Sequence, residues 1–282
     1  MKLKDSKLFK TYIHLINERE SIRVLKESGK PKPWTKDPHL SKWRFTNMRR
    51  MDDKVSLWLL HNWYEPYFDH PNMLYAALVA RFFNHPEALN DITHLVFSDK
   101  GWPKEEMCSL LRKRKARKVT IFNNAYMVRG NDGVDKVDTV MNFTLDPMVK
   151  DPPKVDTNSL ETTWKNIVCR YGMGSFMAGQ VVADLRWAMT GDWSDRNFWA
   201  PVGPGSSRGI CRLYKQPKNK MIDQKVFLPK LTYLREIAGP LINQNLNARM
   251  EMMDWQNSLC EFDKYMRLVT KTGRPKQRYK GT

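Results

Sequence analysis

The sequence predicts a mostly α-helical protein, and three observations lead to that fold class. Apolar residues recur at helical spacing in one segment after another, and prolines and glycines stand where such segments begin and end. Alternating strand and helix units are absent. The 282 residues, 41% of them hydrophobic, are enough for a buried core. We expect a single compact helical domain over 1–282, divisible into two lobes, about 1–158 and 159–268, with a basic tail over 269–282.

The first half of the chain contains five segments with helical patterning. Their ends carry the residues that start or stop helices: a glycine after the last turn, an asparagine before the first, or a proline in the first turn. The segment over 73–84 is apolar almost all round and predicts a buried central helix. The predicted helices are 5–29, closed by Gly29; 47–63, capped by Asn47; 73–84; 87–96, begun by Pro86; and 104–117, begun by Pro103.

The second half is helical apart from two irregular segments. Residues 130–158 show little periodicity, which predicts short turns or strands, or a long loop. Residues 201–209 are rich in glycine, proline and serine and predict a second loop. The remaining predicted helices are 160–171, 175–189, 226–238, 240–254 and 255–269.

The charge of the chain points to a polyanionic partner. Lys and Arg number 48 against 30 Asp and Glu, a net charge of +18. Two segments hold most of the excess: Arg112 to Lys118, with six bases, and Lys264 to Thr282, with seven bases and no acid. Such clustering is typical of a surface that contacts phosphates, although a solvated helix end and a disordered tail would give the same pattern. The first segment gives as DNA-binding candidates Arg112, Lys113, Arg114, Lys115, Arg117 and Lys118.

Several classes of protein and site are disfavoured. The four cysteines are scattered without a CxxC or Cys/His cluster, so the sequence predicts neither a metal site nor a disulfide framework. No Walker A or GxGxxG signature is present, which disfavours ATP-driven phosphoryl transfer within these residues, and we expect no cofactor. With no apolar run of about 18 residues and no signal peptide, we expect a cytoplasmic protein without a membrane partner.

The segment around Gly172 and Gly174 has the pattern of a helix-hairpin-helix. One helix stops at Gly-x-Gly and the next begins at Ser175, with Ala178 small enough for the two helices to pack closely. Such a turn presents backbone N–H groups to a DNA phosphate. An ordinary tight turn between two helices is the simpler interpretation.

Three aspartates follow this turn and are candidate catalytic groups. Asp184 interrupts an otherwise apolar helix face, so if it is buried it needs a partner or a chemical role. Asp192 and Asp195 lie just beyond that helix, where either catalysis or helix capping would explain them.

Two further segments combine arginines with polar groups. Gly203 to Gly209 joins backbone freedom with Ser206 and Arg208, which suits a phosphate or pyrophosphate, whereas a surface turn is the alternative. Trp43 to Asp53 contains three arginines, and Asp53 could orient Arg49 or Arg50 toward a phosphate, although surface ion pairs would have the same pattern. Glu261 and Lys264, three residues apart, normally form only a weak surface pair.

These motifs occur in the order seen in a family of DNA-modifying enzymes. They are RxTNxxRxxD (Arg44, Thr46, Asn47, Arg50, Asp53), ARFFN (Arg81, Asn84), GMGSFMAGQVVADL (Gly172 to Leu185), GPGSSRG (Gly203 to Gly209) and CEFDKYMR (Cys260 to Arg267). In these segments the chain resembles the α-glutamyl/putrescinyl thymine pyrophosphorylases, or amino acid:DNA transferases, a group that includes the helical part of the bacteriophage 5-hydroxymethyluracil DNA kinases. The resemblance implies a fold like that of the helical DNA glycosylases, with a helix-hairpin-helix.

The resemblance also implies a reaction, thymine hypermodification in bacteriophage DNA. A kinase makes 5-pyrophosphoryloxymethyl-deoxyuridine in DNA, and the transferase replaces the pyrophosphate with an amine such as an amino acid or a polyamine. The expected partners are modified double-stranded DNA and a small amine, with the protein as a monomer. Asp184, then Asp195 and Asp192, are the candidate bases. The expected substrate and pyrophosphate ligands are Arg44, Asn47, Arg50, Asp53, Arg81, Asn84, Gln180, Ser206, Arg208 and Lys264.

Three other functions fit the same features. A DNA glycosylase would use the hairpin and an aspartate to release a modified base. A 5-hydroxymethyluracil DNA kinase would need a nucleotide site that the motifs do not reveal. A DNA-binding module without catalysis would need only the basic surface.

Overall fold

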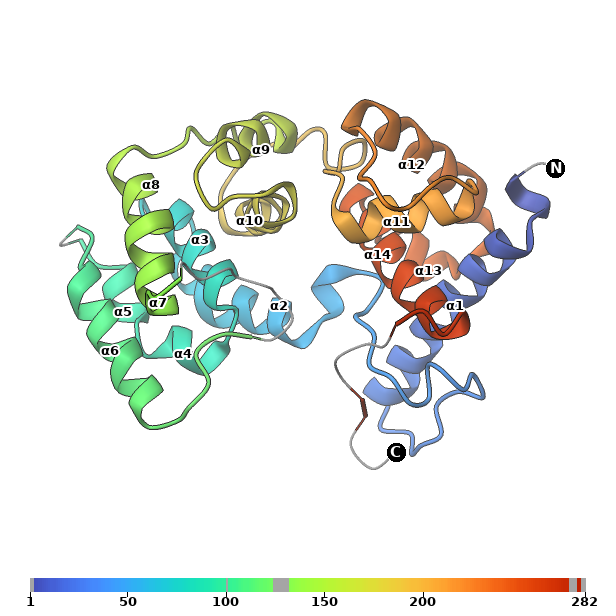
Figure 1. The fold of residues 1–282 in the computed structure, drawn as a ribbon, viewed down its shortest axis with the longest axis horizontal. Helices are drawn as coiled ribbons and strands as arrows, with labels where there is room; N and C mark the ends of the chain where they lie inside the picture. The colour runs from blue at the N-terminus through green and yellow to red at the C-terminus, as the bar shows by residue number, and fades with distance from the viewer. Residues whose placement is uncertain (1–2, 100, 124–131, 274–277, 280–282) are drawn as a thin grey trace. The chain divides into compact units, whose positions relative to one another are not determined.

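We analysed a computed structural model of the chain, which describes residues 3–99, 101–123, 132–273 and 278–279. The described residues are mostly helical, as predicted, and their only extended pairing is an isolated bridge between Trp43 and Arg278. They form two compact units (Figure 1). Unit 1 comprises Met1–Asp53 and Arg196–Thr282, and unit 2 comprises Lys54–Asp195. The lobe boundary expected near residue 158 therefore lies inside unit 2, and both ends of the chain contribute to unit 1.

Unit 1 is built around its last helix. Its helices are α1 (Lys7–Glu27), α11 (Pro204–Leu213), α12 (Gln224–Ala238), α13 (Gln244–Asn247) and α14 (Met252–Val269). Helix α14 packs most extensively against α11 and also contacts α1. Tyr12 of α1 meets Phe262 of α14 edge to face, with ring centroids 5.4 Å apart, and its hydroxyl lies 2.6 Å from Ser258 Oγ. Burial raises the pKa of Tyr12, which therefore stays a neutral hydrogen-bonding group.

Unit 2 surrounds one buried helix. Its helices are α2 (Lys54–Leu59), α3 (Met73–Phe83), α4 (Pro86–Asn90), α5 (Thr93–Val96), α6 (Lys104–Ala116), α7 (Lys136–Asp138), α8 (Asp146–Lys150), α9 (Leu160–Val168) and α10 (Ser175–Ala188). Every residue of α3 except Tyr75 is buried, as its all-round apolar pattern predicts, and α3 packs against α10. The helix ends at Asn84, whose φ of 48° is left-handed.

Three segments differ from the prediction. Asn47 does not cap a helix: it lies in an extended segment, and helix α2 begins only at Lys54. Residues 136–150, expected to be loop or strand, are helical. The prediction failed because the segment consists of short α-helices and a π-helical turn at Thr139–Leu145, which show no sustained 3.6-residue repeat in the sequence. The loop expected over 201–209 becomes helix α11 at Pro204, where proline occupies the first turn and the glycines face another helix.

The other predicted helices form, with shifted ends. The segment 87–96 divides into α4 and α5, and the segment 240–254 forms only the short α13 after a 3₁₀ turn at Gly239–Leu241. Helix α1 is closed by Gly29, as expected, with φ of 72°.

Candidate active site

In unit 1 the RxTNxxRxxD segment lies against helix α14, which carries the CEFDKYMR motif. The backbone N–H of Thr46 donates to Glu261 Oε2 at 3.0 Å, and the N–H of Arg50 donates to Asp254 Oδ1 at 2.8 Å. Asn257 Nδ2 donates to the carbonyl of Asn47 at 3.0 Å. Two motifs about two hundred residues apart in sequence are therefore held together by side-chain hydrogen bonds to backbone.

Asn47 is the polar centre of this cluster. Its N–H donates to Asp53 Oδ1 at 2.9 Å, its Nδ2 donates to the carbonyl of Asp52 at 2.5 Å, and its Oδ1 accepts from Arg19 Nη2. Arg19 is buried and also donates from Nε to the carbonyl of Thr46 at 3.1 Å. Arg19 was not predicted from the sequence, although its position on the apolar face of α1, in phase with Ile16 and Ile22, was a signal.

Asp53 keeps one carboxylate oxygen without a hydrogen-bonding partner among the described residues. Its Oδ1 accepts from Asn47, whereas no described residue donates to Oδ2. Burial raises the pKa of Asp53 from 3.8 to about 6, helped by the negative charge of Glu261 and opposed by the Asn47 hydrogen bond and by Arg19 and Arg50. A carboxylate that is fixed through one oxygen and titrates near neutrality has the properties of a general base.

Two further arginines belong to the same segment as Asp53. Arg44 is exposed and Arg50 is half-buried, and neither guanidinium has a hydrogen bond or ion pair among the described residues. Arg49 pairs with Asp52 at 2.8 Å rather than with Asp53, whereas the positive charge of Arg50 acts on the Asp53 carboxyl without a close ion pair. Glu261 and Lys264 do form a pair, with Glu261 Oε2 3.0 Å from Lys264 Nζ, but it is not the expected surface pair, because Glu261 is buried. Glu261 also accepts the hydrogen bond from the backbone N–H of Thr46.

In unit 2 the ARFFN segment and helix α10 form a second buried polar cluster. Arg81 donates to both oxygens of Asp184 from Nε and Nη2, and the Tyr64 hydroxyl donates to Asp184 Oδ2 at 2.6 Å. Asn84 Oδ1 lies 3.5 Å from Arg81 Nη1, and the buried Gln180 lies one helical turn before Asp184. Asp184 therefore has the partner that its burial requires, and its lone pairs are occupied by donors. Tyr64 was not identified from the sequence.

Asp195 has the contacts of a helix cap. Its Oδ1 accepts from the N–H of Leu160 at 2.8 Å, and its Oδ2 accepts from the N–H of Glu161 and the hydroxyl of Ser159, both at 2.9 Å. These donors belong to the first turn of α9, so the contacts favour the capping interpretation. Asp192 is exposed.

The Gly-x-Gly turn joins α9 to α10, and its two glycines differ. Gly172 has φ of 77°, and a Cβ there would lie 2.4 Å from Thr144 Oγ1, so both backbone and packing require glycine. Gly174 is extended, precedes Ser175 at the start of α10, and has open space around its Cβ position. The turn thus leaves the α10 N-terminus approachable at Gly174.

The basic segment on helix α6 is partly neutralised. Arg112 pairs with Asp138, Lys115 with Asp135, and Arg114 with Glu87 at 2.6 Å and Asp91 at 3.1 Å. The remaining bases, Lys113, Arg117 and Lys118, are exposed and have no ion pair among the described residues. Half of the basic tail over 269–282 lies outside the described residues, although Arg278 stacks on the Trp43 ring at 4.5 Å.

The GPGSSRG residues are placed by helix α11. Ser206 is buried, and its Oγ caps the start of α11 by accepting from the N–H of Gly203 at 3.0 Å. The same oxygen also accepts from Gln256 Nε2 of α14 at 3.1 Å. Arg208 Nε donates to Asp263 Oδ2 at 2.8 Å. Ser206 is therefore occupied by structural contacts, whereas Arg208 keeps its terminal nitrogens available.

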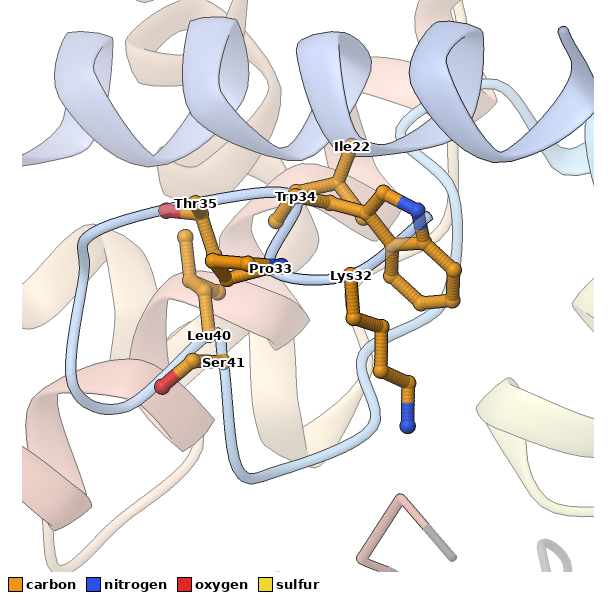
Figure 2. A pocket seen from close by; sticks show the side chains of 7 residues that line it. All are labelled: Ile22, Lys32, Pro33, Trp34, Thr35, Leu40 and Ser41. Carbon is orange, nitrogen blue, oxygen red and sulfur yellow. The ribbon is translucent and has the colours of Figure 1, made fainter. Parts of the chain in front are cut away.

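One cavity of about 270 Å³ opens beside helix α1 (Figure 2). Its lining includes Ile22, Trp34 and Leu40, and the Lys32 ammonium lies 5.6 Å from the Trp34 ring centroid. The lining contains no carboxylate to bind an amine. Within the described parts of the chain, no group of three or more His, Cys, Asp or Glu side chains is arranged to hold a metal ion. A membrane-crossing helix is likewise absent from the described residues.

Comparison with known proteins places the chain in a family. The family model described as "5-hmdU DNA kinase, helical domain" matches residues 6–274. A curated relative, the 5-hmdU DNA kinase of Bacillus phage SP10, is 27% identical over 295 aligned residues, which cover 90% of this chain and 44% of that protein. The chain thus spans less than half the length of that relative, and no solved structure matches it. The match agrees with the kinase part of the resemblance noted above, and the chain belongs to the family of the helical domain of 5-hmdU DNA kinases.

Proposed function

We propose that this chain modifies 5-substituted deoxyuridine in DNA, replacing the pyrophosphate of a 5-pyrophosphoryloxymethyl group with an amine. The observation that carries the proposal is the state of Asp53, held by Asn47 through one oxygen and titrating near neutrality. The family match supports a substrate related to 5-hydroxymethyl-deoxyuridine, because that is the substrate in the relative's name.

Asp53 suits the proton transfer of this reaction. The amine nitrogen forms a bond to the exocyclic carbon, the carbon–oxygen bond breaks, and its electron pair leaves with the pyrophosphate. The proton that the amine loses passes to Asp53 Oδ2, which has no donor among the described residues. Arg44 and Arg50 are placed in the same segment to stabilise the charge that develops on the leaving pyrophosphate.

Asp184 and Asp195 are assigned other tasks in this proposal. Asp184 holds Arg81 and Tyr64 in a buried network, and Asp195 caps helix α9, so neither has an oxygen available to take a proton. We assign the DNA contacts to the turn at Gly174 and to the exposed bases Lys113, Arg117 and Lys118. A helix-hairpin-helix that holds double-stranded DNA while the modified base leaves the stack is part of this proposal.

A second candidate function is phosphorylation of 5-hydroxymethyl-deoxyuridine, favoured by the activity in the relative's name. Asp53 would then take the proton of the hydroxymethyl group as its oxygen attacks a nucleoside triphosphate. These 282 residues contain no Walker A signature, so a nucleotide site in this chain would have to be of another kind.

One experiment separates the two reactions. The purified chain is incubated with duplex DNA containing 5-pyrophosphoryloxymethyl-deoxyuridine and a panel of amines, or with 5-hydroxymethyl-deoxyuridine DNA and ATP, and the digested nucleosides are identified by mass. Amine adducts from the first reaction support the proposal, and phosphorylated nucleosides from the second support the kinase. Abasic sites without adducts would refute both and indicate a glycosylase.

A pair of variants tests the assignment of the base. Asp53→Asn keeps an oxygen to accept from Asn47 but cannot take a proton, so adduct formation should fall by about a hundredfold or more. The matched control is Asp5→Asn, which removes an exposed carboxylate of the same unit that has no partner among the described residues. If the two variants have equal activity, Asp53 is not the base.

A further inference from the structure

We propose that Arg208, Arg212 and Arg267, gathered around the buried Asp263, form a phosphate-binding site in unit 1. The site involves helices α11 and α14 and is separate from the contacts of Asp53. Its ligand is a phosphate group, carried by a DNA backbone or by free phosphate or pyrophosphate. The proposal does not depend on which reaction the chain catalyses.

The glycines of helix α11 build the site. A Cβ at Gly209 would lie 2.2 Å from the carbonyl oxygen of Leu259, and one at Gly205 would lie 3.0 Å from Cys260 Sγ. Only glycine therefore allows α11 to approach α14 this closely, and Figure 1 shows the two helices side by side. Arg208 and Arg212, one turn apart on α11, are thereby brought to Asp263.

The charges in this cluster do not balance. Arg208 Nε donates to Asp263 Oδ2 and Arg212 Nε to Oδ1, each at 2.8 Å, and Arg267 Nε lies 3.5 Å from Oδ2. Asp263 is fully buried and carries one negative charge against three guanidinium groups. One arginine would neutralise it, so the cluster keeps two excess positive charges, which matches a phosphate dianion.

The hydrogen-bonding geometry leaves the outer ends of the arginines available. Each guanidinium is directed to Asp263 through Nε rather than through the two-nitrogen fork that pairs best with a carboxylate. Among the described residues, the terminal nitrogens of the three arginines have no hydrogen-bond or ion-pair partner.

The exposure of the three arginine side chains shows how an anion would reach the cluster. The Arg212 side chain is only 11% exposed, whereas those of Arg208 and Arg267 are 39% and 37% exposed. The terminal nitrogens of Arg212 have no partner among the described residues and are not sealed from solvent, so an anion can replace the water that hydrates them. The two more exposed arginines leave the cluster accessible to such an anion.

Arg267 offers the sharpest test, because its removal spares the fold. It makes no hydrogen bond to Asp263, and the Arg267→Gln variant leaves both 2.8 Å bonds from Arg208 and Arg212 in place. The control is Lys225→Gln, which removes an exposed charge from the same unit that has no ion pair among the described residues. Circular dichroism melts would verify that both variants are folded.

Binding of pyrophosphate and inorganic phosphate is measured by calorimetry, and binding of a duplex oligonucleotide by fluorescence anisotropy at several salt concentrations. R267Q should weaken binding by about tenfold, as expected for one charge-assisted contact, while K225Q stays within about twofold of the wild type. Loss of pyrophosphate or phosphate affinity identifies a free ligand. Loss of DNA affinity with a smaller salt dependence identifies the backbone. If R267Q binds all three probes like K225Q, the arginines only clamp the two helices and the proposal is refuted.

Discussion

Replacing Asp53 with asparagine should stabilise unit 1 at pH 8 while it abolishes activity. The folded protein holds the pKa of Asp53 at about 6, above the ordinary value of 3.8, because burial disfavours the charged form. A carboxyl group with a raised pKa contributes stability in full below pH 3.8, and that contribution is lost as the pH rises through about 6. Asparagine has the shape of the protonated acid and keeps the acceptor for the Asn47 N–H.

The size of the effect follows from the same pKa. A rise from 3.8 to about 6 corresponds to about 3 kcal/mol of preference for the neutral form, at 1.36 kcal/mol for each pH unit. Asp53 is half-buried, so solvent screening reduces this figure to about 2 kcal/mol. At pH 4, where wild-type Asp53 is already protonated, the variant should gain almost nothing.

Urea unfolding of the wild type and D53N at pH 4, 5, 6, 7 and 8 measures this difference. The two free energies of unfolding should diverge as the pH rises, with the variant more stable above pH 6. The control D5N should follow the wild type at every pH, because Asp5 is exposed. If D53N is less stable than the wild type at pH 8, the Asp53 carboxylate is stabilised by its neighbours, and the case for a neutral-pH base is lost.

Three further predictions concern stability and DNA binding. Gly209→Ala should lower the free energy of unfolding by about 2 kcal/mol or more, because its Cβ meets the Leu259 carbonyl. Gly174→Ala, at a helix N-cap with open space around the Cβ, should cost less, about 1 kcal/mol, and equal melting temperatures of the two variants would contradict the helix contact. Asp184→Asn should cost about 3 kcal/mol, because the buried Arg81 guanidinium loses its charged partner, and a loss below about 1 kcal/mol in urea unfolding would contradict that pairing. Neutralising the three unpaired bases should reduce the salt slope of DNA binding by up to about 3, and more than neutralising the three paired ones. An unchanged slope with the unpaired set neutralised would remove this segment from the DNA surface. The unpaired set is K113Q/R117Q/K118Q and the paired set is R112Q/R114Q/K115Q.

Periodicity predicted the helices whose buried faces are long and regular. Helices α1, α3, α9 and α10 follow this rule, and α3 was also predicted as the buried helix. The same rule failed over 136–150, where no helical segment is long enough to repeat its pattern. It failed again at 204–209, where proline and glycine indicate a loop. Here the proline stands in the first turn of a helix, and the glycines allow that helix to pack closely against α14.

The sequence predicted which residues belong to the candidate site better than it predicted which of them contact one another. Asn47, Asp53 and Lys264 lie in one cluster, but the sequence could not show that Arg19 joins it from α1, because that contact depends on tertiary packing. The first choice of base failed for the same reason. Whether Asp184 is free or paired depends on Arg81 and Tyr64, which are more than a hundred residues away in sequence.

Because unit 1 is assembled from both ends of the chain, the order of synthesis affects how it folds. Unit 2 is continuous in sequence and can complete its core while the ribosome is still translating. Helix α1 ends at Glu27, and its partner α14 begins at Met252, so at about 5–20 residues per second α1 waits on the order of ten seconds or more for that partner. During this interval its apolar face, including Tyr12, has no α14 to cover it. The longer the delay before α14 emerges from the ribosome, the more the folding of unit 1 in the cell should depend on chaperones.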